Sequence, residues 1–251
     1  MSRREHGAGE GVATKSLAPA IHRLRAFIPI ETRILVALGF IGLGLFLFIH
    51  LASEVIEGDT MAFDRASLLA LRVPGKPWEP IGPHWLSESF MQVTALGSRT
   101  NLTLITTLVV AYLIAARRPG PAIFVIAATS GGAILSALLK TAFERPRPEI
   151  VPHLVDVASA SFPSGHALNS SVTYLTLGIL LARTERSRPV RVYLISAAIA
   201  LSVLIGVSRV YLGVHWPSDV LAGWCIGSTW AFACWLAVDV IQDRRSRRGT
   251  R

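Results

Sequence analysis

The chain has 251 residues, of which 51% are hydrophobic and only 16% charged, and its mean hydropathy is +0.49. These values exclude an ordinary soluble domain and predict a protein embedded in a membrane. The formal charge of +9 comes from Lys and Arg in short clusters between apolar runs, not from a basic stripe with interleaved aromatic residues. Such clusters are routine beside membrane helices, so we expect no nucleic acid partner.

Apolar runs long enough to cross a bilayer, about 17 to 25 residues each, occur six times. They are Ile34–Ser53, Leu102–Ala116, Pro121–Leu139, Ala167–Ala182, Val192–Ser208 and Val220–Val238. We therefore predict an all-α, polytopic membrane protein with six transmembrane helices. Its membrane domain would cover residues 33–240, between a polar basic tail at 1–32 and a second basic tail at 241–251.

The first connection, residues 54–101, is too long for a bare loop. Amphipathic patterns over Met61–Arg72 and Trp85–Leu96 predict helices that lie in the membrane interface. Trp78, Trp85 and Phe90 suit the headgroup level, where one side of an aromatic ring is wet and the other apolar. A lid that only covers the bundle and a segment that grips substrate are both open interpretations.

Basic residues also predict the orientation of the chain. They cluster before the first span, after the second, after the fourth and after the sixth, all on one side of the predicted membrane. Because cytoplasmic flanks are enriched in Lys and Arg, we expect both termini in the cytoplasm. The first, third and fifth connections then face outward.

The third and fifth connections contain the residues that we expect to carry out the reaction. The third contains Lys140, Arg145, Arg147 and the run Pro163-Ser164-Gly165-His166, and the fifth contains Arg209, His215 and Asp219. Three cations can neutralise phosphoryl oxygens, while a hydroxyl and backbone N–H groups at a helix N-terminus donate to them. One imidazole can attack phosphorus, and a second can protonate the departing oxygen.

Asp219 has two possible roles in the sequence. A helix that starts at Pro217 places Asp219 in its first turn. Its carboxylate could accept from His215 and hold the attacking tautomer, or it could simply cap the helix. Lys140 and Arg147 could likewise be anchoring residues at the membrane interface.

Three segments resemble the three-part signature of the type 2 phosphatidic acid phosphatase superfamily. They are Lys140 to Pro148 (Lys, six residues, Arg-Pro), Pro163 to His166 (Pro-Ser-Gly-His) and Ser208 to Asp219 (Ser-Arg, five residues, His, three residues, Asp). All three match in order and spacing. This family includes lipid phosphate phosphatases, bacterial undecaprenyl diphosphate phosphatases and vanadium haloperoxidases.

The resemblance implies a role for each matched residue. His215 would be the nucleophile, Asp219 its orienting partner and His166 the general acid. The residues that bind the phosphoryl group would be Lys140, Arg147, Arg209, Ser164 and Gly165. No metal or cofactor is implied.

The expected activity is hydrolysis of a lipid phosphate or diphosphate through a phosphohistidine. Undecaprenyl diphosphate, phosphatidate and phosphatidylglycerophosphate are all candidate substrates, and the compact length favours a bacterial inner membrane. A lipid phosphotransferase would use the same residues. A transporter is disfavoured because the charged residues cluster at span ends and not at the midplane.

Two polar residues fall outside the signature. We expect Arg145 to be a solvated loop charge and His50, in the first predicted span, to be a hydrogen-bonded core histidine.

Overall fold

The computed structural model describes residues 30–157 and 159–248. Residues Ala37–Arg251 form one compact unit, and the fold below is that of this unit. Nearly all of the basic tail predicted at 1–32 and the last residues of the tail predicted at 241–251 lie outside the described residues. The cytoplasmic location of both tails stays a prediction.

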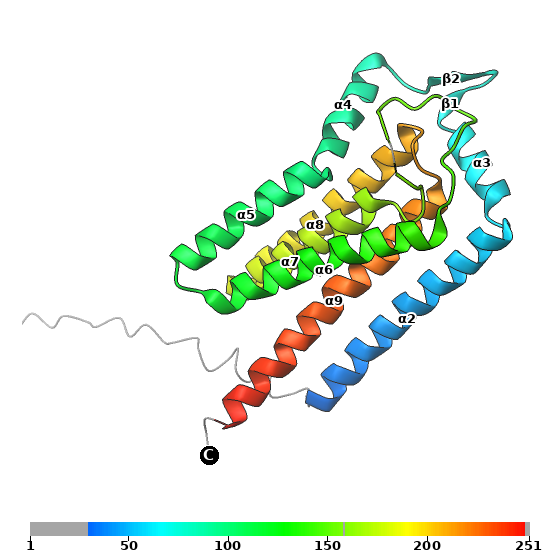
Figure 1. The fold of residues 1–251 in the computed structure, drawn as a ribbon. Coiled ribbons are helices and arrows are strands. Elements are labelled where there is room, and N and C mark those ends of the chain that lie inside the picture. Colours follow the sequence, from blue (N-terminus) through cyan, green and yellow to red (C-terminus); the bar gives the residue numbers. More distant parts are fainter. Residues whose placement is uncertain (1–29, 158, 249–251) are drawn as a thin grey trace, which may run out of the picture. The chain divides into compact units, whose positions relative to one another are not determined.

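Long helices dominate the structure (Figure 1). They are α2 (Ile30–Glu57), α5 (Arg99–Ala115), α6 (Pro119–Phe143), α7 (Gly165–Thr184), α8 (Arg188–Tyr211) and α9 (Pro217–Arg248). Helix α7 packs against α5, α6, α8 and α9, so it is the central helix of the bundle.

Local sequence signals start these helices. Proline lies in the first turn of α6 and of α8, where its missing N–H costs no intrahelical hydrogen bond. The side chains of Ser98 and Ser164 accept from the backbone N–H groups of Asn101 and Ala167, which caps α5 and α7. The start of α7 is thus fixed directly after the Pro163-Ser164 pair.

Within residues 30–157 and 159–248, four helices are long and apolar enough to cross a membrane. Their spans are Ile34–Glu57, Pro119–Phe143, Arg188–Tyr211 and Pro217–Asp243. A fifth span is possible if α4 (His84–Ala95) and α5 count as one helix with a bend of 47°. Four or five apolar spans are therefore confirmed, whereas the full set of six stays a prediction.

Helix α7, the fourth predicted span, is missing from the apolar set for a physical reason. It is central, and its polar side chains Ser170, Ser171, Thr173 and Thr176 are buried among neighbouring helices. A helix that is enclosed by protein does not need a surface as apolar as lipid. Mean hydropathy is therefore a weak indicator for this helix.

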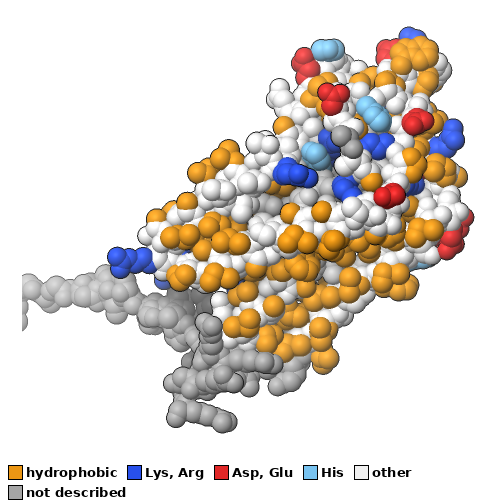
Figure 2. All heavy atoms as spheres, viewed as in Figure 1, with side chains coloured by type: hydrophobic (Ala, Val, Ile, Leu, Met, Phe, Trp, Pro, Cys, Tyr) orange, Lys and Arg blue, Asp and Glu red, His pale blue; other side chains and the backbone are white. Residues whose placement is uncertain are grey.

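The outer surface of the bundle is rich in hydrophobic side chains (Figure 2). Ile49 of α2, Leu108 of α5 and Leu138 of α6 are each more than 60% exposed. Contiguous apolar surface of this kind is rare on soluble monomers and is suited to lipid. In the same view most of the visible Lys, Arg and His side chains lie toward one end of the molecule, and a smaller basic group lies at the opposite end.

The connection between α2 and α5 is more ordered than a loop. It contains α3 (Met61–Leu69), strands β1 (Arg72–Val73) and β2 (Lys76–Pro80), and α4. Two interfacial helices were predicted there. Helices are present at both places with somewhat shifted bounds, and their location in the membrane interface stays a prediction. The antiparallel hairpin was not predicted, so the all-α prediction was incomplete. Its first strand is only two residues long, too short for an alternating pattern to register.

Close packing of α7 on α9 depends on two glycines one helical turn apart. A Cβ at Gly227 would lie 2.6 Å from the main-chain oxygen of Leu168, and one at Gly223 would lie 2.8 Å from that of Ser164. Small residues at this spacing let two helix backbones approach each other closely. The starts of α7 and α9 are thereby brought side by side.

His50 departs from its expected role. Its side chain is 60% exposed on α2, with Nε2 3.4 Å from a carboxylate oxygen of Glu54. The prediction of a core histidine was wrong, because α2 lies at the edge of the bundle and this face of the helix is not covered.

Candidate active site

Four helix ends meet at one end of the bundle, near α3 and the hairpin (Figure 1). Lys140 lies in the last turn of α6, His166 in the first turn of α7 and Arg209 in the last turn of α8. His215 lies in the turn between α8 and α9, and Asp219 in the first turn of α9. The N–H of Ser164 donates to the main-chain oxygen of Asp219 at 2.9 Å, which joins the second and third signature segments.

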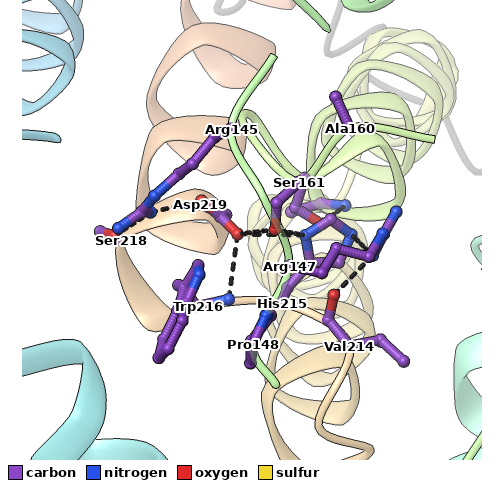
Figure 3. A network of polar contacts seen from close by, with 12 residues as sticks. Arg145, Arg147, Pro148, Ala160, Ser161, Val214, His215, Trp216, Ser218 and Asp219 are labelled. Carbon is purple, nitrogen blue, oxygen red and sulfur yellow. Dashed lines mark hydrogen bonds and ion pairs between the residues drawn. The ribbon is translucent and has the colours of Figure 1, made fainter. Parts of the chain in front are cut away.

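His215 and Asp219 form a buried pair (Figure 3). Nδ1 of His215 lies 3.3 Å from Oδ2 of Asp219, and the two residues are 1% and 0% exposed. A carboxylate in this position favours the tautomer with the proton on Nδ1, which leaves Nε2 unprotonated. This is the arrangement that a nucleophilic imidazole requires.

Asp219 performs both roles that the sequence left open. The same Oδ2 accepts from the backbone N–H of Trp216 at 2.9 Å, so this third residue of α9 reaches back to the residue before the helix. The cap fixes the carboxylate, and the fixed carboxylate contacts His215. The two interpretations are therefore parts of one arrangement.

Ser161 was not predicted, yet it belongs to this cluster. Its hydroxyl donates to Oδ2 of Asp219 and lies 3.4 Å from Nδ1 of His215. It is fully buried. No helical period or signature spacing includes Ser161, since it lies in the irregular loop between α6 and α7.

The loop cation Arg147 lies on the other side of the imidazole. Its Nη1 donates to the main-chain oxygen of Val214 and lies 3.3 Å from Nε2 of His215. Nε donates to the main-chain oxygen of Ser159 at 2.8 Å. Burial lowers the pKa of the Arg147 guanidinium, and the Asp219 carboxylate opposes this shift. The side chain nevertheless stays charged at neutral pH.

Arg209 is held by a residue of the α2–α5 connection. It is only 3% exposed, and its Nη1 donates to the hydroxyl of Thr94 on α4 at 3.0 Å. Its buried Nε has no hydrogen-bond partner among the residues that the structure describes. A buried cation with a spare donor is suited to an anionic ligand, because an unsatisfied charged donor is costly.

The remaining predicted residues line the start of α7. A Cβ at Gly165 would lie 3.3 Å from Cε of Lys140, so the absence of a side chain leaves room for this lysine. The ammonium of Lys140 donates to the main-chain oxygen of Ala160. His166 lies close enough to Arg209, His215, Lys140 and Arg147 for their charges to act on its imidazole. All eight residues predicted for the site therefore gather in one place.

Burial also sets the charge state of His215. It lowers the pKa of the imidazole from its ordinary value to about 3, although the hydrogen bond and the charge of Asp219 oppose the shift. The ring is therefore neutral at physiological pH. A neutral imidazole is the nucleophilic form, because the attacking nitrogen must carry a lone pair.

The expectation for Arg145 was wrong. It is buried, and its guanidinium lies between two carboxylates, those of Asp219 at 2.6 Å and Asp64 at 2.8 Å. It also lies over the Trp216 ring, 5.7 Å from the ring centroid. Asp64 belongs to α3, so this contact joins residues far apart in the sequence and leaves no local signal.

No group of three or more His, Cys, Asp or Glu side chains that could hold a metal ion occurs within residues 30–157 and 159–248. Metal independence stays a prediction.

Two histidines and three cations lie at one end of this helical bundle, a set of groups that can bind and transfer a phosphoryl group. The profile of the PAP2 superfamily matches residues 120–243, which include all three signature segments. Phosphatidylglycerophosphatase B of Bacillus subtilis is 32% identical over 183 residues, or 72% of this chain and 85% of that protein. The chain belongs to the PAP2 superfamily, as the signature predicted.

Two further similarities agree with membership of the PAP2 superfamily. An undecaprenyl-diphosphatase of Sulfolobus acidocaldarius is 44% identical over 72 residues, which are 29% of this chain and 31% of that protein. The crystal structure of a transmembrane PAP2 type phosphatidylglycerolphosphate phosphatase from Bacillus subtilis matches with a TM-score of 0.65 and 26% identity. That match covers 81% of this chain and 96% of the other. The predicted class, a phosphoric ester hydrolase that acts on lipid phosphates, is confirmed.

Proposed function

We propose that this membrane phosphatase hydrolyses a lipid phosphate through a phosphohistidine on His215, with phosphatidylglycerophosphate as the first candidate substrate. The observation that carries the proposal is the environment of the imidazole. Nδ1 faces the Asp219 carboxylate, and Nε2 faces the cation Arg147. A nucleophile that is oriented on one side and faces an anion-binding group on the other is suited to attack at phosphorus.

In the first step, the lone pair of His215 Nε2 attacks phosphorus while the bond from phosphorus to the lipid oxygen breaks. The departing oxygen takes a proton from the His166 imidazolium. A bound phosphate dianion favours this protonated form of His166, because an opposite charge nearby stabilises it. The lipid alcohol leaves, and the phosphoryl group stays on Nε2.

In the second step, water attacks the phosphohistidine. Neutral His166 accepts a proton from the water, and the electron pair of the nitrogen–phosphorus bond returns to Nε2. Inorganic phosphate is the product, and both histidines return to their starting states. Asp219 stabilises the positive charge on His215 during both displacements.

Lys140, Arg147 and Arg209 would bind the phosphoryl oxygens during these steps. Each has a protein contact that fixes its position: Ala160 for Lys140, Val214 for Arg147 and Thr94 for Arg209. Backbone N–H groups in the first turn of α7, near Ser164 and Gly165, lack intrahelical partners and add donors. Fixed cations and donors stabilise a transition state without reorganising during the reaction.

Two relatives guide the choice of substrate. Phosphatidylglycerophosphatase B is similar over most of its length, which supports phosphatidylglycerophosphate. Undecaprenyl diphosphate is the second candidate, because the similarity to an undecaprenyl-diphosphatase reaches 44% identity, although over a short segment. Both lipids present a terminal phosphate to the same cradle.

The membrane placement is part of the proposal. Helices α5 and α7 would complete six spans, and α3 and α4 would lie in the interface. Phe63 on α3, Trp78 on β2 and Trp85 on α4 are each more than half exposed, which suits contact with lipid headgroups. Arg117, Arg183 and other basic residues lie at the helix ends opposite the site. The site therefore faces the outside of a bacterial inner membrane, and both termini face the cytoplasm.

The test uses purified full-length protein in detergent. Phosphate release is measured from phosphatidylglycerophosphate, undecaprenyl diphosphate and phosphatidate, with EDTA present and with added magnesium. We expect activity without metal, inhibition by vanadate, and loss of at least about 1,000-fold in His215→Ala. The matched control is His84→Ala, because the His84 side chain is 88% exposed. Full activity of His215→Ala would refute the mechanism.

A lipid alcohol added to the same assay tests the phosphotransferase alternative. Hydrolysis releases one phosphate for each lipid alcohol formed. Transfer to the added alcohol with little phosphate released would instead identify a phosphotransferase.

A further inference from the structure

The catalytic carboxylate has a second set of contacts that the signature does not include. Oδ2 of Asp219 faces His215, Ser161 and the backbone of Trp216, whereas Oδ1 accepts from Nη1 of Arg145 at 2.6 Å. One oxygen of the carboxylate therefore contacts the imidazole, and the other contacts Arg145. Figure 3 shows Arg145 on the side of Asp219 away from His215.

Arg145 does not hold Asp219 alone. Its Nη2 donates to Oδ2 of Asp64 at 2.8 Å and to the hydroxyl of Thr60 at 3.3 Å. Its Nη1 donates also to the hydroxyl of Ser218 at 2.8 Å. The guanidinium thus bridges two carboxylates and fixes the rotation of both. Rigid, planar geometry makes arginine suited to such a bridge.

Asp64 lies on α3 and contacts the first turn of α9. Its Oδ1 accepts from the backbone N–H of Ser218 at 2.9 Å, and its Oδ2 accepts from the Ser218 hydroxyl at 2.6 Å. It is fully buried. A residue of the α2–α5 connection therefore contacts the backbone directly beside Asp219.

The balance of buried charges explains why Arg145 needs a second carboxylate besides that of Asp219. Arg145, Asp64 and Asp219 are all buried, and a buried charge is stable only when it is paired and hydrogen-bonded. If Asp64 were neutral, the whole positive charge of Arg145 would act on Asp219. This would draw negative charge away from the imidazole, whose positive charge the carboxylate must stabilise during attack. Asp64 therefore leaves Asp219 available to His215.

We propose that Arg145 and Asp64 are positioning residues of the reaction, and that the connection between α2 and α5 takes part in catalysis through Asp64. Arg145 and Asp64 fix the position of the Asp219 carboxylate, and this carboxylate orients the His215 imidazole. This inference rests on the proposed function of His215. Neither residue contacts the phosphoryl group, so both act on turnover and not on phosphate binding.

The experiment compares Asp64→Asn and Arg145→Gln with controls that make the same chemical change at exposed positions. The controls are Asp59→Asn and Arg65→Gln. Full-length protein in detergent is assayed with phosphatidylglycerophosphate, and inhibition by inorganic phosphate is measured for each variant. Thermal unfolding reports the folded fraction.

We expect kcat to fall about 10- to 100-fold in each of the two variants, the loss typical of a hydrogen bond to a charged group. The KM and the inhibition constant of phosphate should stay within about threefold of the wild type, because no phosphate-binding residue is changed. The double variant should lose little more than the worse single variant, since the residues act as one unit. Wild-type kcat in both single variants would overturn the inference.

Ser218→Ala keeps the inference testable if a charge variant fails to fold. It removes hydrogen bonds to Arg145 and Asp64 without leaving a buried charge unpaired. We expect a fall in kcat of about three- to tenfold with unchanged KM, and an unchanged kcat would count against the network. An inactive wild type would instead refute the proposed function, so the two failures are distinguishable.

Discussion

Nη1 of Arg147 lies 3.3 Å from Nε2 of His215, on the edge of the imidazole that faces away from Asp219. In the proposed mechanism, the cation and the attacking nitrogen face the same phosphoryl group, and phosphoryl oxygens bound to Arg147 would place phosphorus beside Nε2. One side chain would then both bind and align the substrate.

This geometry predicts different effects for two replacements of Arg147. Arg147→Lys keeps the charge but loses the planar donors, and we expect it to lower kcat/KM about 10-fold. Arg147→Ala removes the charge as well, and a loss of about 100-fold or more is expected. Steady-state kinetics with phosphatidylglycerophosphate measure both. Equal losses in the two variants would contradict a role for donor geometry, and Arg65→Ala is the exposed control.

The role of His166 predicts a dependence on the leaving group. A general acid matters when the departing oxygen is a poor leaving group and matters little when it is a good one. We expect His166→Gln to lower hydrolysis of an alkyl lipid phosphate about 100-fold and that of p-nitrophenyl phosphate less than about 10-fold. Phosphate release from the two substrates measures this. The same loss with both would show that His166 acts other than as the acid.

The pKa of His215 predicts the behaviour of the enzyme in acid. Because burial lowers this pKa to about 3, the ring stays neutral, and hence nucleophilic, as the pH falls from 7 to about 5. Protonation abolishes the nucleophile only at lower pH. Nitrogen NMR of histidine-labelled protein, with His215→Ala to assign the resonance, follows the titration. A midpoint at the ordinary histidine value would contradict the buried, neutral state.

Thr94 offers a test of how α4 supports the site. Thr94→Val keeps the shape of the side chain and removes the hydroxyl that accepts from Arg209. We expect KM to rise and kcat/KM to fall about 10-fold, because Arg209 loses a fixed position. Thr94→Ser keeps the hydroxyl and should stay within about twofold of the wild type. A serine variant as impaired as the valine variant would point to packing instead.

Helix packing predicts a loss of stability at Gly227. A methyl group there would meet the main-chain oxygen of Leu168, and the helices must shift to relieve the clash. We expect Gly227→Ala to cost about 1 to 3 kcal/mol. Gly39→Ala is the control, because a Cβ at this position would meet no described residue beyond the adjoining backbone of α2 within 4 Å. Thermal unfolding in detergent compares the two, and equal melting temperatures would contradict the packing argument.

The sequence predicted most of the site residues because membrane topology determines which connections lie on the same side. Spans that alternate across a membrane place every second connection on the same side, so Lys140, His166 and His215 had to share one face. Signature spacing then fixed which side chains belong together. The structure brings these residues together as expected.

The supporting contacts could not be predicted in the same way. Arg145 and Asp64 are 81 positions apart, and no period or spacing links an irregular loop to a short helix in another connection. The one local signal is Pro146, which restricts the backbone of Arg145 and so favours a fixed position for it. Ser161 and Thr94 lacked even this signal.

Mean hydropathy was also a poor guide to the environment of α7. Its run Ala167–Ala182 was predicted as a span, although this helix has buried serine and threonine side chains and is not among the apolar spans of the structure. A window average measures suitability for lipid, and a central helix mostly contacts protein. Tertiary packing decides its environment.

The hydrogen bond from the Ser164 N–H to the main-chain oxygen of Asp219 uses no side-chain atom. Amino acid replacements at either position, proline at 164 excepted, keep both of its partners. The contact between the segment that carries His166 and the segment that carries His215 is therefore independent of which side chains stand at 164 and 219. Side chains around the site could then differ between lipid preferences while this main-chain link stays in place.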